Sequence, residues 1–271
     1  AGLSPEWAGA LVSMVLSEDL GGNPGRDVTT NSIISSDARS VVNIVARAEG
    51  MLAGAPLMPV VLAEVAGRFG QPMPAVDMRL NDGAHVKPGD VIAVMSGSTR
   101  VLLIAERTML NMVCRASGVA THTNAWSSAL AGTSVQVLDT RKTTPGLRAL
   151  EKYAVRIGGG TNKRMGLYDV AMIKDNHKLA AGSVTAAYHK VRALFPNVPV
   201  QVEVTTTDEA VEAVRAGVRY LMLDNMSVGD MKLTVQAARR ATDEKVQIDV
   251  RGRKIPATVK KPPFVQSGVA S

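Results

Sequence analysis

The alternation of hydrophobic and polar positions changes along the chain and predicts three regions of structure. Residues 4–20 carry apolar side chains at helical spacing behind a serine that can cap the first turn, which predicts a helix followed by a turn-rich loop. Residues 40–100 alternate in the β manner between glycine turns. Within this second region, Pro88-Gly89 predicts a tight turn between two short strands.

From about residue 101 onward, helical patterns alternate with short apolar strands. Strands are predicted at 135–140, 169–175, 198–204, 220–226 and 245–250, and helices at 101–116, 147–157, 183–195, 206–217 and 227–241. Thr206 and Glu209 have capping-box spacing, Gly217 suits the end of that helix, and Ser227 suits the start of the last one. Strands that alternate with helices are parallel, and nearly continuous apolar strands indicate burial on both faces. A doubly wound sheet and a (β/α) barrel both have this order.

Composition narrows the class of protein. Hydrophobic residues make up 46% of the 271 and aromatic residues 3%, so aliphatic side chains and methionine must fill the core. The single cysteine, Cys114, cannot form an internal disulfide, and its helical context predicts a core position. There is no apolar run of about 18 residues and no basic leader, so we expect no membrane span, no signal peptide and a cytoplasmic location.

The positive charge is concentrated in one part of the chain. The net charge is +7, and residues 139–178 hold nine Lys or Arg against four Asp or Glu, which is five of those seven charges. A concentrated excess suits a small, highly charged anion. Nucleic-acid binding is disfavoured because almost no aromatic side chains lie among the cations.

Ionisable side chains occur at or just after the last residues of four successive predicted strands. The carboxyl ends of parallel strands meet at one rim, where active sites are built. The first two strands lead to cations, which suit an anionic substrate: Arg141 and Lys142, then Lys174. The next two carry the carboxylates Glu203 and Asp224, which suit Mg²⁺ or a developing positive charge. For any one of these residues, a solvated position or a structural ion pair is an equal alternative. The glycine run 158–160 could bring backbone amides close to an anion, although a flexible turn is the commoner explanation.

Several motifs resemble those of the quinolinate phosphoribosyltransferases, also called carboxylating nicotinate-nucleotide pyrophosphorylases. They are "DTRKTTPGLRALEKYAVRIGGG", "NKRMGLYDVAMIKDNH", "ERTMLN", "SGVAT", "EDL", "DVTT" and "AEGMLAG", in order over about residues 15 to 230. The resemblance implies that quinolinate and phosphoribosyl pyrophosphate (PRPP) react, with Mg²⁺, to give nicotinate mononucleotide, pyrophosphate and CO₂ in NAD biosynthesis. It also implies an N-terminal α/β sandwich (residues 1–104), a (β/α) barrel of the type II phosphoribosyltransferases (residues 105–271) and a homodimer.

The resemblance further assigns roles to individual side chains in these motifs. Substrate-binding roles are implied for Arg107, Thr140, Arg141, Lys163, Arg164, Lys174 and Asn176. Of these, Arg141, Arg164 and Lys174 are expected to bind the quinolinate carboxylates, and Arg107 to reach the site of the neighbouring subunit. Catalytic roles are implied for Lys142, placed near PRPP, and for Glu203 and Asp224, placed near the ribose and its metal ion.

The chain departs from the family pattern at two places. Lys163 occupies a position where the family usually has histidine, which keeps a positive charge but removes a ring that titrates near neutral pH. The chain ends "VQIDVRGRKIPATVKKPPFVQSGVAS", with "VRGRKI" (250–255) in place of a glycine-rich phosphate loop and without the family's final strand. We therefore expect a truncated or divergent end after about residue 245. Arg251, Arg253 and Lys254 suit either a phosphate or solvent, which leaves the site for the PRPP 5′-phosphate unassigned.

Three other functions stay open at this point. A related pyrophosphorylase-like enzyme would use another anionic acceptor, and a catalytically impaired scaffold would bind quinolinate without turning over PRPP. A nucleic-acid-binding module would show steeply salt-dependent binding to DNA or RNA.

Overall fold

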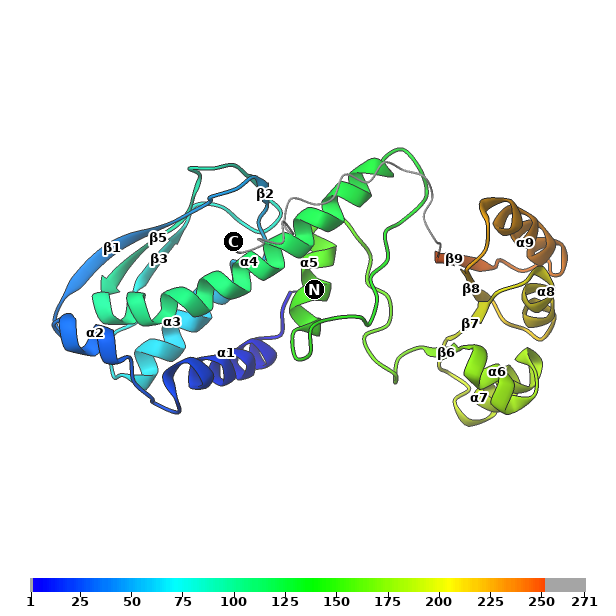
Figure 1. The fold of residues 1–271 in the computed structure, drawn as a ribbon, viewed down its shortest axis with the longest axis horizontal. Helices are drawn as coiled ribbons and strands as arrows, with labels where there is room; N and C mark the ends of the chain where they lie inside the picture. Colours follow the sequence, from blue (N-terminus) through cyan, green and yellow to red (C-terminus); the bar gives the residue numbers. More distant parts are fainter. Residues whose placement is uncertain (1, 252–271) are drawn as a thin grey trace, which may run out of the picture. The chain divides into compact units, whose positions relative to one another are not determined.

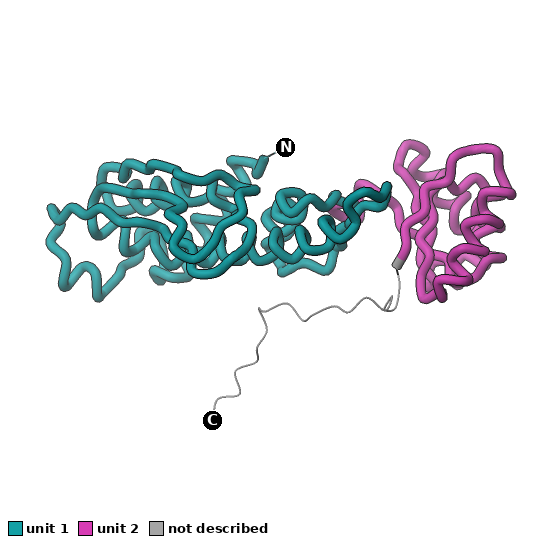
Figure 2. The backbone as a smooth tube through the Cα atoms, turned by 90° about the horizontal axis from the view of Figure 1, so that it is seen from above, with its two compact units in different colours: residues 1–163, 266–271 teal, residues 164–265 magenta. Residues whose placement is uncertain are grey.

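The computed structural model describes residues 2–251 of the chain. It forms two compact units that divide between Lys163 and Arg164, shown in teal and magenta in Figure 2. We describe the two units separately, as unit 1 and unit 2. None of the helices in the described residues combines the length and apolar character needed to cross a bilayer.

Unit 1 contains the predicted β region, which folds into two small antiparallel sheets (Figure 1). Its strands are β1 (Arg39–Val45), β2 (Gly50–Met51), β3 (Ala75–Met78), β4 (His85–Val86) and β5 (Val91–Ser98). One sheet has the order β1-β5-β3, and the other pairs β2 with β4. The predicted turn at Pro88-Gly89 joins β4 to β5, and Gly89 has a φ of 95°, which a residue with a side chain rarely adopts.

Helices cover these sheets and supply most of the apolar core of unit 1. They are α1 (Pro5–Leu20), α2 (Val28–Ile33), α3 (Leu57–Arg68), α4 (Thr99–Ala129) and α5 (Arg148–Ile157). As predicted, Ser4 caps α1, because its hydroxyl accepts the Trp7 amide. Leu16, Leu62 and Met95 are fully buried in the shared core. Burial of each such side chain favours the folded state by about 1.5–3 kcal/mol.

Two expectations for unit 1 are wrong. Cys114 is exposed rather than in the core, because the buried stripe of α4 runs through Met109, Val113 and Ala116 on another face. The strand predicted at 135–140 is reduced to a single β-bridge between Leu138 and Thr161. The expected domain boundary after residue 104 lies within α4, one continuous helix of 31 residues, and stays a prediction.

Unit 2 is a parallel α/β layer in which strands and helices alternate. Its strands are β6 (Ala171–Ile173), β7 (Val200–Val204), β8 (Tyr220–Asp224) and β9 (Gln247–Arg251), and its helices are α6 (Asp175–Ala181), α7 (Val184–Leu194), α8 (Thr207–Arg215) and α9 (Val228–Arg240). The sheet order is β6-β7-β8-β9, and Figure 1 shows the helices on one face of it. Right-handed crossovers in one direction put every helix on the same face. This arrangement is that of a barrel wall, whereas a doubly wound sheet reverses its strand order. The two-part α/β architecture is thus confirmed.

The central strands β7 and β8 are largely buried on both faces, as expected, but only the face under the helices is uniformly apolar. Val202 and Leu221 belong to the core beneath the helices. The alternate positions, such as Gln201 and Glu203, point to the opposite face because successive side chains of a strand alternate. The face away from the helices is therefore the polar one.

The helix boundaries predicted in unit 2 are largely confirmed. The Thr206 hydroxyl accepts the Glu209 amide and caps α8, Gly217 follows α8 with a φ of 106°, and Ser227 caps α9. The capping box is incomplete, because the Glu209 carboxylate accepts the amide of Thr205 rather than that of Thr206.

Candidate active site

The candidate site in unit 2 lies at the carboxyl ends of the strands, on the polar face of the sheet. Residue pairing aligns Glu203 of β7 with Met222 of β8, so Asp224 lies two positions further along the same face of β8. Parallel strands that end together put their terminal side chains at one rim. Glu203 and Asp224, predicted from strand ends in the sequence, therefore share this rim.

Lys174 and Glu203 form an ion pair at this rim. Lys174 follows the last residue of β6, and its Nζ lies 3.9 Å from Glu203 Oε2. The Glu203 side chain is 8% exposed and that of Lys174 is 42% exposed. A buried carboxylate needs a partner, and Lys174 provides one. The Lys174 main chain is fixed, because its N–H donates to Nδ1 of His177 at 2.9 Å, while the ammonium group stays accessible to a ligand.

Arg164 and Asp224 are each held by neighbouring groups of the same unit. The Arg164 guanidinium donates to the Val170 carbonyl at 3.2 Å and contacts Sδ of Met172 at 3.4 Å. Met172 is aligned with Gln201, so this contact lies on the polar face of the sheet. Asp224 accepts a 2.9 Å hydrogen bond from the Asn225 side chain. Thus Arg164 and Asp224 lie on the same face as the Lys174–Glu203 pair.

The two carboxylates are of the kind that could hold a magnesium ion. Within residues 2–251, no three His, Cys, Asp or Glu side chains are grouped as metal ligands. Mg²⁺ is commonly held by one or two carboxylates, with waters and substrate phosphates as the other ligands. Glu203 and Asp224, on adjacent strand ends, match that pattern.

In unit 1, the segment Thr140–Lys142 presents cations from a turn. The Thr140 hydroxyl accepts the Lys142 amide at 3.0 Å, and the Lys142 side chain is exposed. Arg141 is half-buried, and its Nε is buried without a hydrogen-bond partner among the described residues. A buried donor without a partner is costly, and an anion would satisfy it. Arg141 is therefore suited to bind a carboxylate or phosphate.

The remaining predicted residues occupy exposed or half-buried positions. Arg107 is exposed on α4 of unit 1, Asn176 is exposed in the first turn of α6, and Lys163 is half-buried at the end of unit 1. The proposed phosphate contacts of Arg253 and Lys254 lie outside the described residues, as do Gly252 and the rest of the divergent end. Arg251 is the last residue of β9.

The glycine run does not form an anion site, which corrects that hypothesis. The amides of Gly158, Gly159 and Gly160 donate to the carbonyls of Ala154, Arg156 and Val155 within unit 1. A Cβ at Gly158 would lie 2.4 Å from the carbonyl oxygen of Ala120 and 2.7 Å from Cβ of Thr123. The run therefore lets this loop pack directly against α4.

Lys178, part of the concentrated positive charge, serves the structure of unit 2. Its Nζ lies 2.8 Å from both Asp175 and Glu209, and it also donates to the Glu203 carbonyl at 3.2 Å. Burial opposes the charged form, but the hydrogen bonds to the two carboxylates outweigh it and raise the pKa of Lys178. Because its donors are committed to these partners, Lys178 is poorly placed to bind a substrate.

Sequence reasoning missed several side chains that hold the site residues. Glu151 and Lys152 are buried neighbours on α5, Asn162 bonds to Asp139, and Asn225 bonds to Asp224. Adjacent opposite charges on an amphipathic helix normally indicate a solvated face. The local spacing gave no signal of their burial, because positions one and two after the buried Leu150 lie on other faces of the helix.

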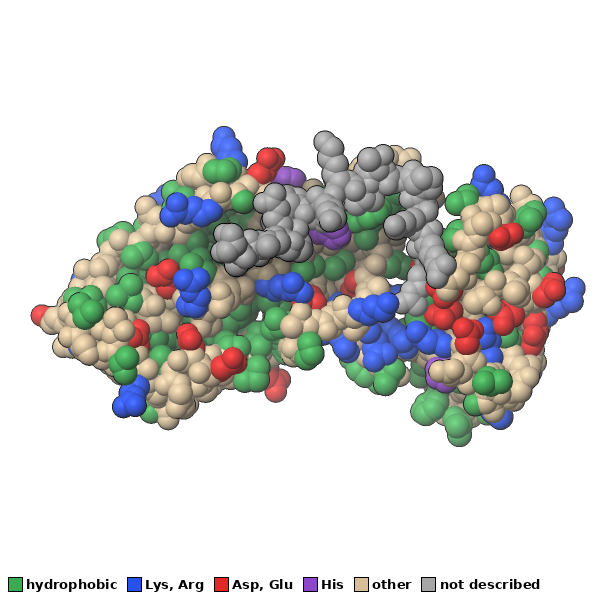
Figure 3. All heavy atoms as spheres, viewed as in Figure 1, with side chains coloured by type: hydrophobic (Ala, Val, Ile, Leu, Met, Phe, Trp, Pro, Cys, Tyr) green, Lys and Arg blue, Asp and Glu red, His purple; other side chains and the backbone are tan. Residues whose placement is uncertain are grey.

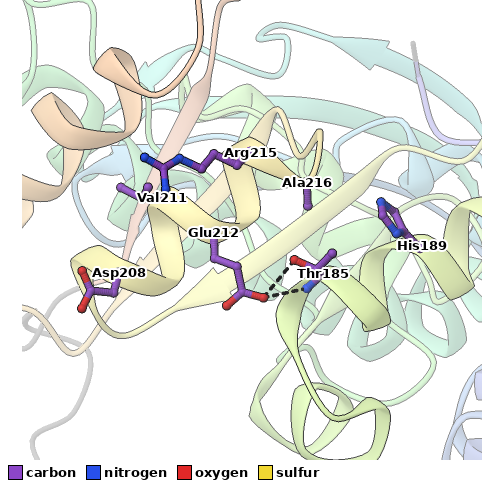
Figure 4. A pocket seen from close by; sticks show the side chains of 7 residues that line it. All are labelled: Thr185, His189, Asp208, Val211, Glu212, Arg215 and Ala216. Atoms are coloured by element: carbon purple, nitrogen blue, oxygen red, sulfur yellow. Dashed lines mark hydrogen bonds between the residues drawn. The ribbon is translucent and has the colours of Figure 1, made fainter.

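A separate hollow of about 620 Å³ lies between α7 and α8, among side chains of both signs (Figure 4). It is lined by Thr185, His189, Asp208, Val211, Glu212, Arg215 and Ala216. Figure 4 shows the Glu212 carboxylate turned toward Thr185, whose N–H and hydroxyl donate to it at 3.0 and 2.9 Å. None of the predicted site residues lies there. Figure 3 likewise shows acidic and basic side chains interspersed over the outer helices of unit 2.

Comparison with known protein families gives two matches that together cover most of the chain. Residues 27–117 match the N-terminal domain of quinolinate phosphoribosyl transferase, and residues 119–269 match its C-terminal domain. The chain is 43% identical to the nicotinate-nucleotide pyrophosphorylase (carboxylating) of Mycobacterium leprae, over 83% of this chain and 78% of that protein. It is 40% identical to the probable enzyme of the same name from Bacillus subtilis, over 79% of this chain and 72% of that protein.

Solved structures agree with these matches. NadC from Streptococcus pyogenes aligns with a TM-score of 0.85 and 35% identity, over 94% of this chain and 86% of that one. The nicotinate-nucleotide pyrophosphorylase from Francisella tularensis aligns with a TM-score of 0.81 and 34% identity, over 92% of this chain and 84% of that one.

Proposed function

We propose a reaction for this chain from its family, since it belongs to the quinolinate phosphoribosyltransferases. It transfers the phosphoribosyl group of PRPP to quinolinate with loss of CO₂. The products are nicotinate mononucleotide and pyrophosphate, and the reaction belongs to NAD biosynthesis. The observation that carries the proposal is the grouping of Arg164, Lys174, Glu203 and Asp224 on one face at the carboxyl end of the parallel sheet.

Cations of the chain bind the two acid groups of quinolinate. We assign this role to Arg141, Arg164 and Lys174. The guanidinium of an arginine can bind a carboxylate with two parallel hydrogen bonds, whereas a lysine contributes a point charge. Support comes from the buried Nε of Arg141, which no acceptor within residues 2–251 satisfies, and from the accessible ammonium group of Lys174. Thr140, Lys163 and Asn176 complete the proposed substrate-binding set.

Bond exchange takes place at the anomeric carbon of PRPP. Its bond to the pyrophosphate oxygen breaks, and a bond to the quinolinate ring nitrogen forms. The ribose carbon gains positive charge in the transition state, so carboxylates nearby favour it. Glu203 and Asp224 are assigned to this position, and Lys142 to the departing pyrophosphate, whose negative charge its ammonium group neutralises.

A magnesium ion fits this scheme, with Glu203 and Asp224 as the residues that would hold it. Bound with PRPP, it would neutralise charge on the leaving pyrophosphate. Both carboxylates are pre-positioned by the chain, Glu203 by Lys174 and Asp224 by Asn225.

Loss of CO₂ follows ribosylation of the ring nitrogen. The pyridinium ring withdraws electrons and stabilises the ylide that remains when the adjacent carboxylate leaves as CO₂. A proton then replaces it on the ring carbon. The cations that bind the second carboxylate hold the ring in place during this step.

We further propose a homodimer in which Arg107 reaches the site of the neighbouring subunit. Its exposure on α4 supports this assignment, since the guanidinium is available to another chain. The cytoplasmic location stays a prediction.

The test is formation of nicotinate mononucleotide from quinolinate, PRPP and Mg²⁺. We expect product with quinolinate, none with nicotinate, which lacks the second carboxylate, and none after a chelator removes the metal. Glu203→Gln should lose activity, whereas Glu244→Gln, an exposed ion-pair residue of unit 2, should not. Binding of quinolinate without turnover would identify a scaffold and overturn the proposal.

A further inference from the structure

Unit 1 contains a buried ion pair beside the segment that carries Arg141 and Lys142. The Nζ of Lys152, on α5, lies 2.5 Å from Oδ1 of Asp139. The two side chains are 2% and 4% exposed. A buried ion pair contributes little net stability, because desolvation of both charges offsets their attraction. The hydrogen bonds that the two side chains make to other segments therefore indicate what the pair does.

The Asp139 carboxylate joins two segments of the chain. Its Oδ1 also accepts the backbone N–H of Lys163 at 2.8 Å, and its Oδ2 accepts the side-chain amide of Asn162 at 2.7 Å. Asn162 donates in addition to the Lys152 carbonyl at 2.8 Å. Residues 139–142 and 161–163 are thus fastened to each other and to α5 by one carboxylate.

Glu151, the residue before Lys152 on α5, holds the other end of the segment 139–144 by hydrogen bonds. The Glu151 carboxylate accepts the Thr144 hydroxyl at 2.7 Å and the Thr144 amide at 3.2 Å. It also accepts two hydrogen bonds from Arg115, at 2.9 and 2.6 Å. Residues 140–143 are therefore held at both ends by consecutive residues of one helix.

Burial alone would raise the pKa of Glu151, but hydrogen bonds from Thr144 and Arg115 outweigh it and lower the pKa. Glu151 is therefore ionised at neutral pH, and the contact is charge-assisted. Such hydrogen bonds are roughly twice as strong as those between neutral groups.

We propose that Asp139 and Lys152 are positioning residues, whose buried pair fixes the segment carrying Arg141 and Lys142 relative to the one carrying Lys163. This inference rests on the proposed function, because these cations are assigned to substrate. Pre-ordered cations bind an anion without the cost of ordering a loop at the moment of binding. Loss of the pair should therefore weaken quinolinate binding more than it slows the chemical step.

The decisive variant is Asp139→Asn/Lys152→Met in the full chain. It removes both charges together, so no unpaired charge is left in the core, and it should melt closer to the wild type than either single variant. The amides of Asn162 and Lys163 bond to different oxygens of Asp139, and Asn puts an NH₂ donor in place of one of them, so the two amides can no longer both be satisfied. We expect the quinolinate KM to rise at least tenfold and kcat to fall by a smaller factor, because the same segment also carries Lys142.

A matched control separates positioning from stability. Arg68 is a buried cation of unit 1 that pairs with Glu64 and donates to Ser13 and Gly22. Arg68→Met should lower the melting temperature and leave the quinolinate KM unchanged at a temperature where the protein is folded. If the quinolinate KM of the Asp139/Lys152 double variant recovers together with its melting temperature, the pair is structural only and the proposal is wrong.

Two further measurements keep the test decisive. Asn162→Ala leaves the ion pair intact and removes one fastening contact, so it covers the case in which the double variant does not fold. Its quinolinate KM should rise several-fold, and a wild-type value would overturn the proposal. Hydrogen exchange of the Lys163 amide should be at least tenfold faster in the Asp139→Asn variant, with exchange in α3 unchanged. Absence of turnover in the wild type would instead overturn the proposed function, and the positioning role with it.

Discussion

Arg141→Ala should abolish most quinolinate binding without unfolding the protein. Arg141 is half-buried, and its Nε has no hydrogen-bond partner among the described residues. Truncation therefore leaves no buried carboxylate unpaired in this part of the chain. We expect the free energy of unfolding to change by no more than about 0.5 kcal/mol, as for substitutions away from tightly bonded groups.

The size of the binding loss follows from the contact that the guanidinium can make. A hydrogen bond to a charged group contributes about 1.5–3 kcal/mol, and a paired guanidinium–carboxylate contact makes two such bonds that share one desolvation cost. We take about 2–4 kcal/mol for the pair, which corresponds to a rise of about 30- to 700-fold in the quinolinate dissociation constant.

Titration calorimetry with quinolinate measures this loss directly, and a thermal melt on the same sample verifies folding. Arg141→Lys is an informative second variant, because it keeps the positive charge but cannot make the paired hydrogen bonds of a guanidinium. Its affinity for quinolinate should lie between those of the wild type and the alanine variant. Arg239→Ala, an exposed cation on α9, controls for the change in net charge. Wild-type affinity or turnover in the folded Arg141→Ala variant would refute the assignment.

Three further predictions concern groups that hold the fold. Lys178→Met should cost about 1.5–3 kcal/mol of unfolding free energy in a denaturant titration, because it removes the charged hydrogen bond to the partly buried Glu209, while Asp175 stays solvated; a loss below about 0.5 kcal/mol would contradict this. Burial would raise the pKa of Glu209, but hydrogen bonds from Lys178 and the Thr205 amide outweigh it and lower the pKa below 4.5. The contribution of Glu209 to the free energy of unfolding should therefore be complete above pH 4.5 and be lost as the pH falls through the lower pKa of the folded state. A plot of unfolding free energy against pH should be flatter for Glu209→Gln than for the wild type, and equal slopes would count against the pairing. Gly158→Ala should cost about 1–3 kcal/mol through its clash with α4, whereas Gly118→Ala, with open space around it, should stabilise by up to about 1 kcal/mol; similar melting shifts would disprove the close contact.

Local patterns predicted the elements whose signals lie within a few residues of one another. The caps at Ser4, Thr206 and Ser227 and the turn at Pro88-Gly89 were confirmed, because each depends on hydrogen bonds or dihedral preferences of adjacent residues. The alternation of strands and helices likewise predicted the parallel layer of unit 2. The strand expected at 135–140 did not form, since propensity cannot supply a pairing partner, and only Leu138 bridges to another segment.

The site was predicted in part for the same reason. Strand ends are visible in the sequence, and they indicated Lys174, Glu203 and Asp224, which the fold places on one face of unit 2. The contacts that fix these groups are not visible, because the partner comes from elsewhere in the chain. Glu203, for example, meets a lysine 29 positions earlier, and the Lys152–Asp139 pair spans 13 positions.

The concentration of positive charge shows why the distinction matters for function. Lys152 and Lys178 are buried against carboxylates, whereas Lys142 is exposed and the Nε of Arg141 has no acceptor in the described part of the chain. Composition counts all four as equivalent charges, yet the first two neutralise the chain's own carboxylates and the last two have capacity left for a ligand. The positive charge available to a dianionic substrate is therefore smaller than the excess along residues 139–178 suggests. The buried ion pairs hold the segments that carry the remaining cations. A protein built in this way should discriminate anions by the placement of their acid groups more than by their total charge.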